Sequence, residues 1–171
     1  NNKPQSKHVG KILFTHFGLS GPMILIISID IGELLKYGDV MLLLDLMPSY
    51  DSGSLDKYLQ TILKLHQNKK IKNSLSEIIP QALVPYILEL AQIDPEKPVN
   101  ILTKDERLAV VRHIKNLQIT VTGLLGEDKA IITSGGVDLR EIDFKTMQST
   151  QYNNLFIVGD MLNIDRPSGG Y

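Results

Sequence analysis

The sequence of 171 residues contains no cysteine, which excludes disulfides, thiolate catalysis and cysteine-based zinc or iron–sulfur sites in this chain. It also has no excess of one charge, since 18 Lys and Arg stand against 19 Asp and Glu, a formal net charge of -1. This balance argues against a strongly basic nucleic-acid-binding surface and against a polybasic membrane patch. The most apolar run, residues 23–31, is too short to span a bilayer. We therefore expect a cytoplasmic protein without nucleic-acid or membrane partners.

A signal peptide is also missing from the first residues. Asn1 to Pro4 include neither an initiator Met nor the apolar stretch of a secretory signal, and we interpret this end as a cut point. A hydrophobic share of 43% is enough for a packed core, and the length suits one domain or one and a half.

The predicted elements run in the order strands, helices, strands, which is typical of an α+β fold rather than of a βαβ alternation. The patterns predict strands at residues 8–15, 40–46, 119–122, 130–133 and 155–158. Residues 119–122 and 130–133 are expected to form a hairpin, and residues 155–158 a strand covered on both faces. Residues 23–36 suit a strand or a helix. We predict a helix, because Ser20 could cap it with Pro22 in its first turn.

The middle of the chain is predicted to be a helical block. Ser54 is expected to cap an amphipathic helix, and its apolar face comprises Leu55, Leu59, Ile62, Leu63 and His66. Two pairs have capping-box spacing, Ser74 with Glu77 and Thr103 with Glu106.

Three glycine-containing stretches are the candidates for chemistry. Gly159 and Asp160 follow an apolar run, where a ligand could approach the backbone and a carboxylate could accept a sugar or ribityl hydroxyl. An ordinary turn is the alternative. Residues 168–170 (SGG) could expose N–H groups before a helix, or form a flexible loop. Gly135 and Gly136 could bring backbone near a ring system, or form a tight turn.

The four histidines have no metal-ligand spacing, so no metal site is predicted. His16, between Thr15 and Phe17-Gly18, is the most interesting of them, and a packing or hydrogen-bonding role is favoured over a catalytic one. The pattern singles out no catalytic residue.

Four stretches together resemble a bacterial family of NAD(P)/FAD-dependent oxidoreductases, some of whose members are described as aminoacetone-oxidase-family FAD-binding enzymes. They are residues 13–22 (LFTHFGLSGP), 132–137 (ITSGGV, followed by Glu141, Ile142, Thr146 and Met147), 155–160 (LFIVGD) and 168–171 (SGGY). In that family a Rossmann-like FAD-binding domain is interrupted by an insert built from a small β-barrel and a helical subdomain.

The resemblance implies a small β-barrel-like sheet with an inserted helical bundle, plus a fragment of a Rossmann-like FAD-binding domain. Residues 1–132 would be the insert, and residues 133–171 the incomplete return segment into the FAD-binding domain. Within the insert, the barrel part would comprise residues 1–48 and 118–132, and the helical subdomain residues 49–117.

The resemblance also implies the site residues. Cofactor binding falls to Gly159, Asp160, Ser168, Gly169 and Gly170, and the substrate would lie near Gly135, Gly136 and His16. Asp160 stands where many members carry Glu, Ser168 where Thr is common, and Asn163 where Asp is usual; Arg166 and Pro167 replace a more glycine-containing pattern.

The intact protein would then pass a hydride between FAD and a nicotinamide or organic substrate, with NAD(P)H as a possible co-substrate. Its partners would be the rest of its own flavin domain and a small-molecule substrate. The 171 residues alone are expected to bind no FAD, to be inactive, and to be able to self-associate. The alternative is a non-catalytic binding or scaffolding module whose helical block presents a surface to a substrate or partner. RNA binding is a third possibility, which the near-neutral charge disfavours.

Overall fold

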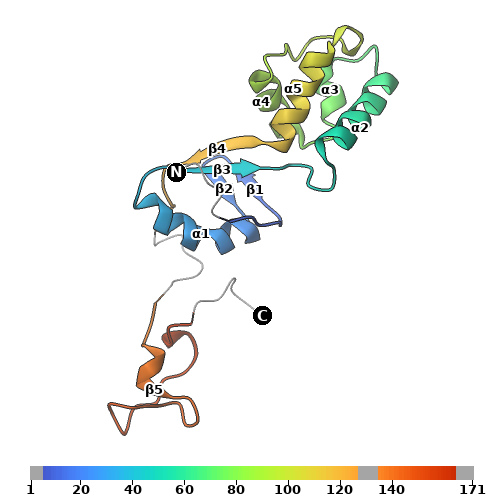
Figure 1. The fold of residues 1–171 in the computed structure, drawn as a ribbon. Helices are drawn as coiled ribbons and strands as arrows, with labels where there is room; N and C mark the ends of the chain where they lie inside the picture. Colours follow the sequence, from blue (N-terminus) through green and yellow to red (C-terminus); the bar gives the residue numbers. More distant parts are fainter. Residues whose placement is uncertain (1–5, 127–134, 165–171) are drawn as a thin grey trace. The chain divides into compact units, whose positions relative to one another are not determined.

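The structure, a computed structural model, describes residues 6–126 and 135–164 (Figure 1). The chain divides into two compact units, residues 41–121 and residues 1–40 together with 122–171. The described strands form three separate two-stranded sheets, β1-β2, β3-β4 and β5-β6. An α+β fold with a small β-barrel-like sheet was expected. The structure is a small domain of mixed helices and strands, and within the described residues its strands do not close into a barrel. None of the described helices is both long enough and apolar enough to cross a membrane.

The N-terminal part is a hairpin followed by a helix. β1 (Leu13–Thr15) pairs antiparallel with β2 (Gly18–Ser20), and α1 (Pro22–Leu35) follows. The helix predicted from the ambiguous apolar run is confirmed, with Pro22 in its first turn. The predicted Ser20 cap is wrong, because Gly21 is the N-cap residue and no side chain caps this helix.

Glycine is needed at position 21 because the start of α1 lies against the chain that enters β1. Its φ is +101°, and a Cβ there would lie 3.1 Å from the backbone N of Leu13 and 3.2 Å from the carbonyl O of Lys11. Any larger residue would combine an unfavourable backbone conformation with a tight contact. The predicted strand over residues 8–15 is correspondingly shorter, and only its last three residues pair.

The unit of residues 41–121 is mainly helical. Its elements are β3 (Val40–Leu44), α2 (Ser52–Leu65), α3 (Ile71–Leu75), a 3₁₀ turn (Gln81–Leu83), α4 (Val84–Leu90), a second 3₁₀ turn (Val99–Ile101), α5 (Lys104–Lys115) and β4 (Leu117–Val121). α5 packs against both α2 and α4 (Figure 1). The side chains with almost no exposed surface include Leu55, Leu59, Ile71, Leu75, Ile87, Leu88, Val110, Ile114 and Leu117. Burial of this apolar face, more than helix propensity, stabilises these short helices.

The helix starts show which sequence signals hold. The capping box of Thr103 and Glu106 is confirmed at α5. At α2 the cap is Asp51, whose carboxylate accepts the N–H of Ser54 at 2.8 Å, so the predicted Ser54 cap is wrong. The box of Ser74 and Glu77 is wrong too, because Ser74 lies fully buried inside α3.

β4 pairs with β3, a strand more than 70 residues earlier in the chain. The hairpin partner predicted at residues 130–133 lies outside the described residues. The junction is fixed by Lys115, whose ammonium donates to the carboxylate of Asp45 and to the carbonyls of Met47 and Tyr50. Its three donors thus connect the end of α5 to the loop that follows β3.

Residues 135–164 contain a small hydrophobic cluster of their own. A 3₁₀ turn (Leu139–Glu141) leads into the hairpin of β5 (Ile142–Asp143) and β6 (Gln148–Ser149), and a 3₁₀ turn (Gly159–Met161) follows later. Its buried residues are Ile142, Ile157 and Leu162. The polar stretch around residues 141–144 suits a short strand or a turn, and the structure has the strand β5 there.

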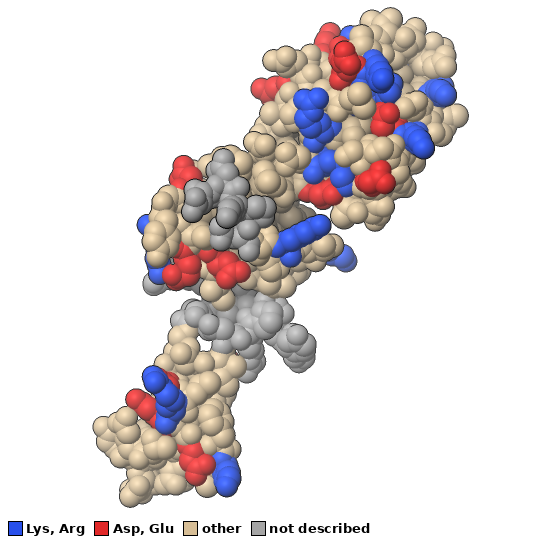
Figure 2. Space-filling view, viewed as in Figure 1, with Lys and Arg blue, Asp and Glu red and all other residues tan. Residues whose placement is uncertain are grey.

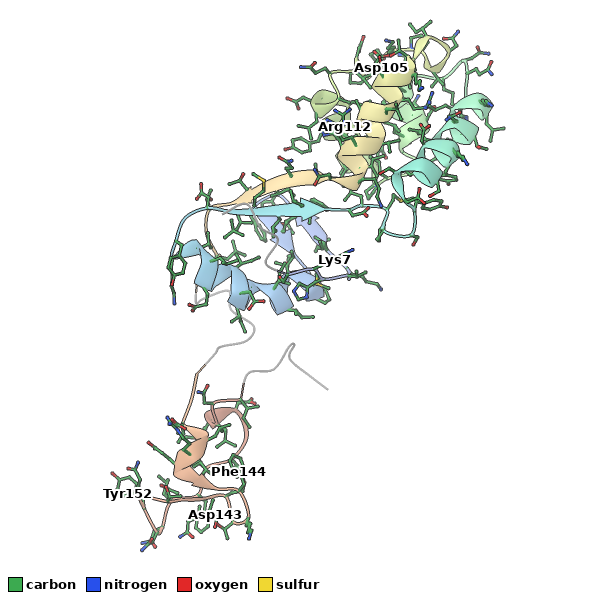
Figure 3. The ribbon with its side chains drawn as sticks, viewed as in Figure 1. Lys7, Asp105, Arg112, Asp143, Phe144 and Tyr152 are labelled. Atoms are coloured by element: carbon green, nitrogen blue, oxygen red, sulfur yellow. The ribbon has the colours of Figure 1, made fainter. Side chains whose placement is uncertain are left out.

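The buried strand predicted at residues 155–158 is wrong for the structure described. Ile157 is buried, but Phe156 and Val158 are 61% and 60% exposed. The segment pairs with β6 through a single bridge, between Phe156 and Gln148. Among the described residues no second strand pairs with it. Four further large apolar residues of this segment, Leu155, Met161, Ile164 and Phe144, are exposed as well, and so is Tyr152 (Figure 3).

A candidate cofactor-facing site and its relatives

Two of the glycine stretches singled out in the sequence meet in residues 135–164. A Cβ on Gly136 would lie 2.7 Å from the carbonyl O of Met161 and 2.7 Å from the backbone C of Leu162. Val137 donates its N–H to Met161 at 2.9 Å, and Asn163 donates to Val137 at 3.0 Å, which makes a short parallel pairing. The pair Gly135-Gly136 is thus held beside the turn that contains Gly159 and Asp160.

Gly136 and the two neighbouring glycines have different requirements. Gly136 is needed because its own chain passes close by. Gly135 and Gly159 have φ values of +121° and +69°, and a Cβ on either would meet nothing within 4 Å. Among the described residues, therefore, nothing blocks approach to their backbone; a turn that contacts a ligand must meet this condition, which Gly18, Gly38 and Gly126 also meet. Asp160 is exposed on the same turn as Gly159.

The remaining predicted site residues lie elsewhere. Ser168, Gly169 and Gly170 fall outside the described residues. His16 is exposed at the two-residue turn between β1 and β2, where its ring meets Phe17 edge to face with 4.9 Å between centroids. Its nearness to a substrate stays a prediction.

Electrostatics around the glycine stretches are local. Asp138 accepts two hydrogen bonds from the Arg140 guanidinium, at 2.6 Å and 3.1 Å for the closest pairs. These bonds, helped by the backbone N–H of Arg140, lower the pKa of Asp138 to about 2. Among residues 6–126 and 135–164 no three potential ligand side chains gather in a way that could hold a metal ion.

The helical unit of residues 41–121 contains a hollow that the sequence did not predict. It has a volume of about 330 Å³. Its polar lining comprises Gln60, Lys64, Gln67, Asn100 and Arg107. Its apolar lining comprises Leu63, Val99 and Leu102. The available signal was the pair Gln60 and Lys64, which stand four residues apart on α2 beside its apolar stripe, with Gln67 just beyond the C-cap residue His66.

Arg107 is held rigidly at this hollow. Its Nε donates to Oδ1 of Asp56 at 2.6 Å and its NH2 to Oδ2 at 3.3 Å, while Gln60 donates to the same carboxylate at 2.7 Å. Both charged side chains are 17% exposed. The bond from Arg107 is the main reason that the pKa of Asp56 lies below its ordinary value; partial burial opposes this, and the bond from Gln60 adds to it. Elsewhere on the helical unit, basic and acidic side chains are interspersed (Figure 2).

The structure is a small domain of mixed helices and strands, with an exposed turn at Gly159–Met161. Residues 1–132 match the family described as HI0933-like protein barrel and H2TH domain. The chain belongs to this flavoprotein-related family. The resemblance to the aminoacetone-oxidase group is not confirmed, so the assignment rests on the broader family.

Curated relatives extend the similarity beyond residue 132. The chain is 30% identical over 162 residues to the ribosomal RNA dihydrouridine synthase of Escherichia coli, covering 94% of this chain and 38% of that protein. It is 27% identical over 167 residues to the 3-dehydro-bile acid delta(4,6)-reductase of Clostridium scindens, covering 97% of this chain and 41% of the reductase. It is 29% identical over 161 residues to the ribosomal RNA dihydrouridine synthase of Haemophilus influenzae, covering 94% and 38%. The chain therefore spans about two fifths of the length of the curated relatives it matches.

Proposed function

We propose that these residues are part of an FAD-dependent oxidoreductase, in which residues 1–132 form the insert and residues 133–171 return into a Rossmann-like flavin domain. The observation that carries the proposal is the open turn at Gly159 and Asp160 beside Gly135, in a chain of a flavoprotein-related family. We propose that the exposed apolar residues between positions 155 and 164 pack against the rest of the flavin domain. NAD(P)H is the proposed electron donor.

The described residues fit a flavin at this turn. The backbone at Gly135 and Gly159 has room for a ligand, and the exposed carboxylate of Asp160 can accept a bond from a ribityl hydroxyl. Ser168, Gly169 and Gly170 are proposed to contact the edge of the isoalloxazine ring, and Gly135, Gly136 and His16 to lie near the substrate. The bound flavin would supply hydride transfer, while the chain's residues orient it and exclude water.

The substrate class follows from the chemistry that the relatives' names share. Dihydrouridine is uridine with a saturated base ring, and a delta(4,6)-reductase reduces ring double bonds. We infer that the whole protein reduces a carbon–carbon double bond conjugated to a carbonyl in a flat ring, adding a hydride to one carbon and a proton to the other. A small molecule is the first candidate for this substrate, in line with the near-neutral charge.

A uridine within RNA is the second candidate substrate, because two of the similar proteins are ribosomal RNA dihydrouridine synthases. The two candidates are separated by supplying the flavin-loaded whole protein and NADPH with ribosomal RNA or with a conjugated steroid ketone. Dihydrouridine in the RNA would favour the second candidate, and consumption of the steroid alone the first.

Asp160→Ala in the whole protein tests the site. Loss of a hydrogen bond to a charged group is expected to weaken FAD binding about tenfold or more. Lys145→Ala, an exposed change in the same segment, is the control and should leave flavin content unchanged. A whole protein that contains no flavin and binds none would refute the function and favour the scaffolding alternative. Equal FAD affinity in both variants would refute only the role of Asp160.

A further inference from the structure

The hollow between α2, α5 and the Val99–Ile101 turn combines features that a flat polar ligand requires. Its apolar lining is the half-buried Leu102 together with the edges of Leu63 and Val99, which are largely buried. Around them stand three side-chain amides, which can donate and accept hydrogen bonds at the same site. They are Gln60, Gln67 and Asn100.

The cations at the hollow favour one anionic group. Arg107 uses its Nε and one N–H of NH2 on Asp56, so three of its five N–H donors remain for other acceptors. Its charge is offset by Asp56, whereas exposed Lys64 makes no ion pair with any residue in the described ranges. The net local charge is therefore close to +1, which matches one phosphate group better than a polyanion.

A planar guanidinium with a fixed orientation also suits a planar ring. Arg stacks on flat ring systems, and its fork bonds phosphate oxygens in a bidentate geometry. The Asp56 contact restrains this fork before any ligand arrives, which lowers the entropy lost on binding. The hollow's volume of about 330 Å³ lies within the range of roughly 300–1,000 Å³ that holds small ligands.

We propose that this groove, lined by Gln60, Lys64, Gln67, Asn100 and Arg107, binds one nucleotide unit. The base lies on the apolar lining and hydrogen-bonds the amides, and the phosphate contacts Lys64 and Arg107. The inference rests in part on the proposed function, which supplies two sources of such a unit, NAD(P)H and a uridine-containing RNA strand. The groove lies within the unit of residues 41–121 and shares no residue with the proposed flavin site.

Calorimetry on the whole protein tests the groove with four probes: uridine monophosphate, NADPH, a single-stranded hexamer of uridine, and inorganic phosphate. The test variant is Lys64→Ala, because Arg107→Gln would also leave Asp56 without its partner and destabilise the fold. Lys57→Ala removes the same charge from α2 outside the groove and is the control. Gln67→Ala is a second test variant that changes no charge.

The expected result is binding of uridine monophosphate that Lys64→Ala and Gln67→Ala each weaken about tenfold and that Lys57→Ala leaves within about twofold. Tighter binding of the hexamer that Lys64→Ala and Gln67→Ala weaken would assign the groove to an RNA strand, and tighter binding of NADPH that the same two variants weaken would assign it to the coenzyme. No nucleotide binding, equal effects of Lys64→Ala and Lys57→Ala, or phosphate binding as tightly as the nucleotide would overturn the proposal. Calorimetry measures this binding without turnover, at residues that the proposed flavin site does not contain. Failure of the groove proposal therefore leaves the proposed function standing, and failure of the proposed function leaves the groove proposal standing.

Discussion

At the scale of single residues, the chain contains glycines with the same backbone signature and different reasons for it. Gly135 and Gly136 both have positive φ, at +121° and +135°, yet only Gly136 has backbone atoms within 3 Å of its missing Cβ. The sequence alone shows two adjacent glycines and cannot distinguish these cases, because the difference depends on a segment 25 residues further along.

Gly136→Ala is expected to destabilise the segment of residues 135–164 by more than Gly135→Ala does. Both substitutions incur the strain of a positive φ, about 1–3 kcal/mol, but only the first also forces apart the pairing of Val137 with residues 161–163. Amide hydrogen exchange at Val137 and Asn163 measures the effect. Equal loss of protection in the two variants would contradict the close approach.

The Asp56–Arg107 pair predicts a pH-dependent contribution to stability. Arg107 lowers the pKa of Asp56 below its ordinary value of 3.8, so the contribution is complete above that value and is lost as pH falls through the lowered pKa. Asp56→Asn should therefore reduce the unfolding free energy by about 1–3 kcal/mol at pH 7, with the difference from the native protein shrinking below pH ~4. Denaturant unfolding at a series of pH values measures this. A difference that stays constant down to pH ~2 would show that the charge of Asp56 is not involved.

At the scale of elements, α5 is the best-specified helix, because its cap, its charges and its buried face agree. Thr103 and Glu106 close the capping box, acidic residues occupy the first turn and basic residues the last. Val110, Val111 and Ile114 turn into the core of the helical unit.

Thr103→Ala should lower the stability of this unit by about 1 kcal/mol, because the N–H of Glu106 loses its acceptor. Thr103→Ser keeps the hydroxyl and serves as the control; because Ser is at least as good an N-cap residue as Thr, we expect no loss of stability from the cap. Chemical denaturation followed by circular dichroism compares them. If the two variants were equally destabilised, the methyl group rather than the cap would be the stabilising feature.

The same elements show how far the sequence predicts this fold. α2 follows from its apolar spacing and α5 from its capping box, and both signals act over a few residues. For α1 the apolar run left strand and helix open, and only Pro22 of its two predicted start signals holds. The choice among nearby cap residues fails at Ser20 and Ser54, because Gly21 and Asp51 compete for the same position and the approach of the chain decides between them. The role of Ser74 and the pairing of β4 with β3 depend on tertiary contacts that no local pattern contains.

The candidate sites show the same division. Gly135, Gly136, Gly159 and Asp160 were found from the sequence, because glycine pairs and a Gly-Asp step after an apolar run are visible without a structure. The groove at Arg107 was not found, because its residues come from three separate segments and only Gln60 and Lys64 on α2 leave a trace in the sequence.

At the scale of the whole molecule, the central feature is how little of the segment at residues 135–164 is buried. Among its described residues, only Ile142, Ile157 and Leu162 form a buried hydrophobic core. Five large apolar side chains between positions 155 and 164 stay exposed. The curated relatives are more than twice as long as this chain. Both facts agree with the proposal that the segment is one wall of a flavin domain completed by other residues of the same protein.

The most direct test of that proposal is an FAD titration, followed by flavin fluorescence and calorimetry, of residues 1–171 and of the whole protein side by side. We predict tight FAD binding by the whole protein and weak or no FAD binding by the 171 residues, because these residues supply only one side of the cofactor site. Tight binding by the 171 residues would contradict the split site, since a complete flavin site would then lie within them. Absence of binding by both would contradict the flavoprotein proposal itself.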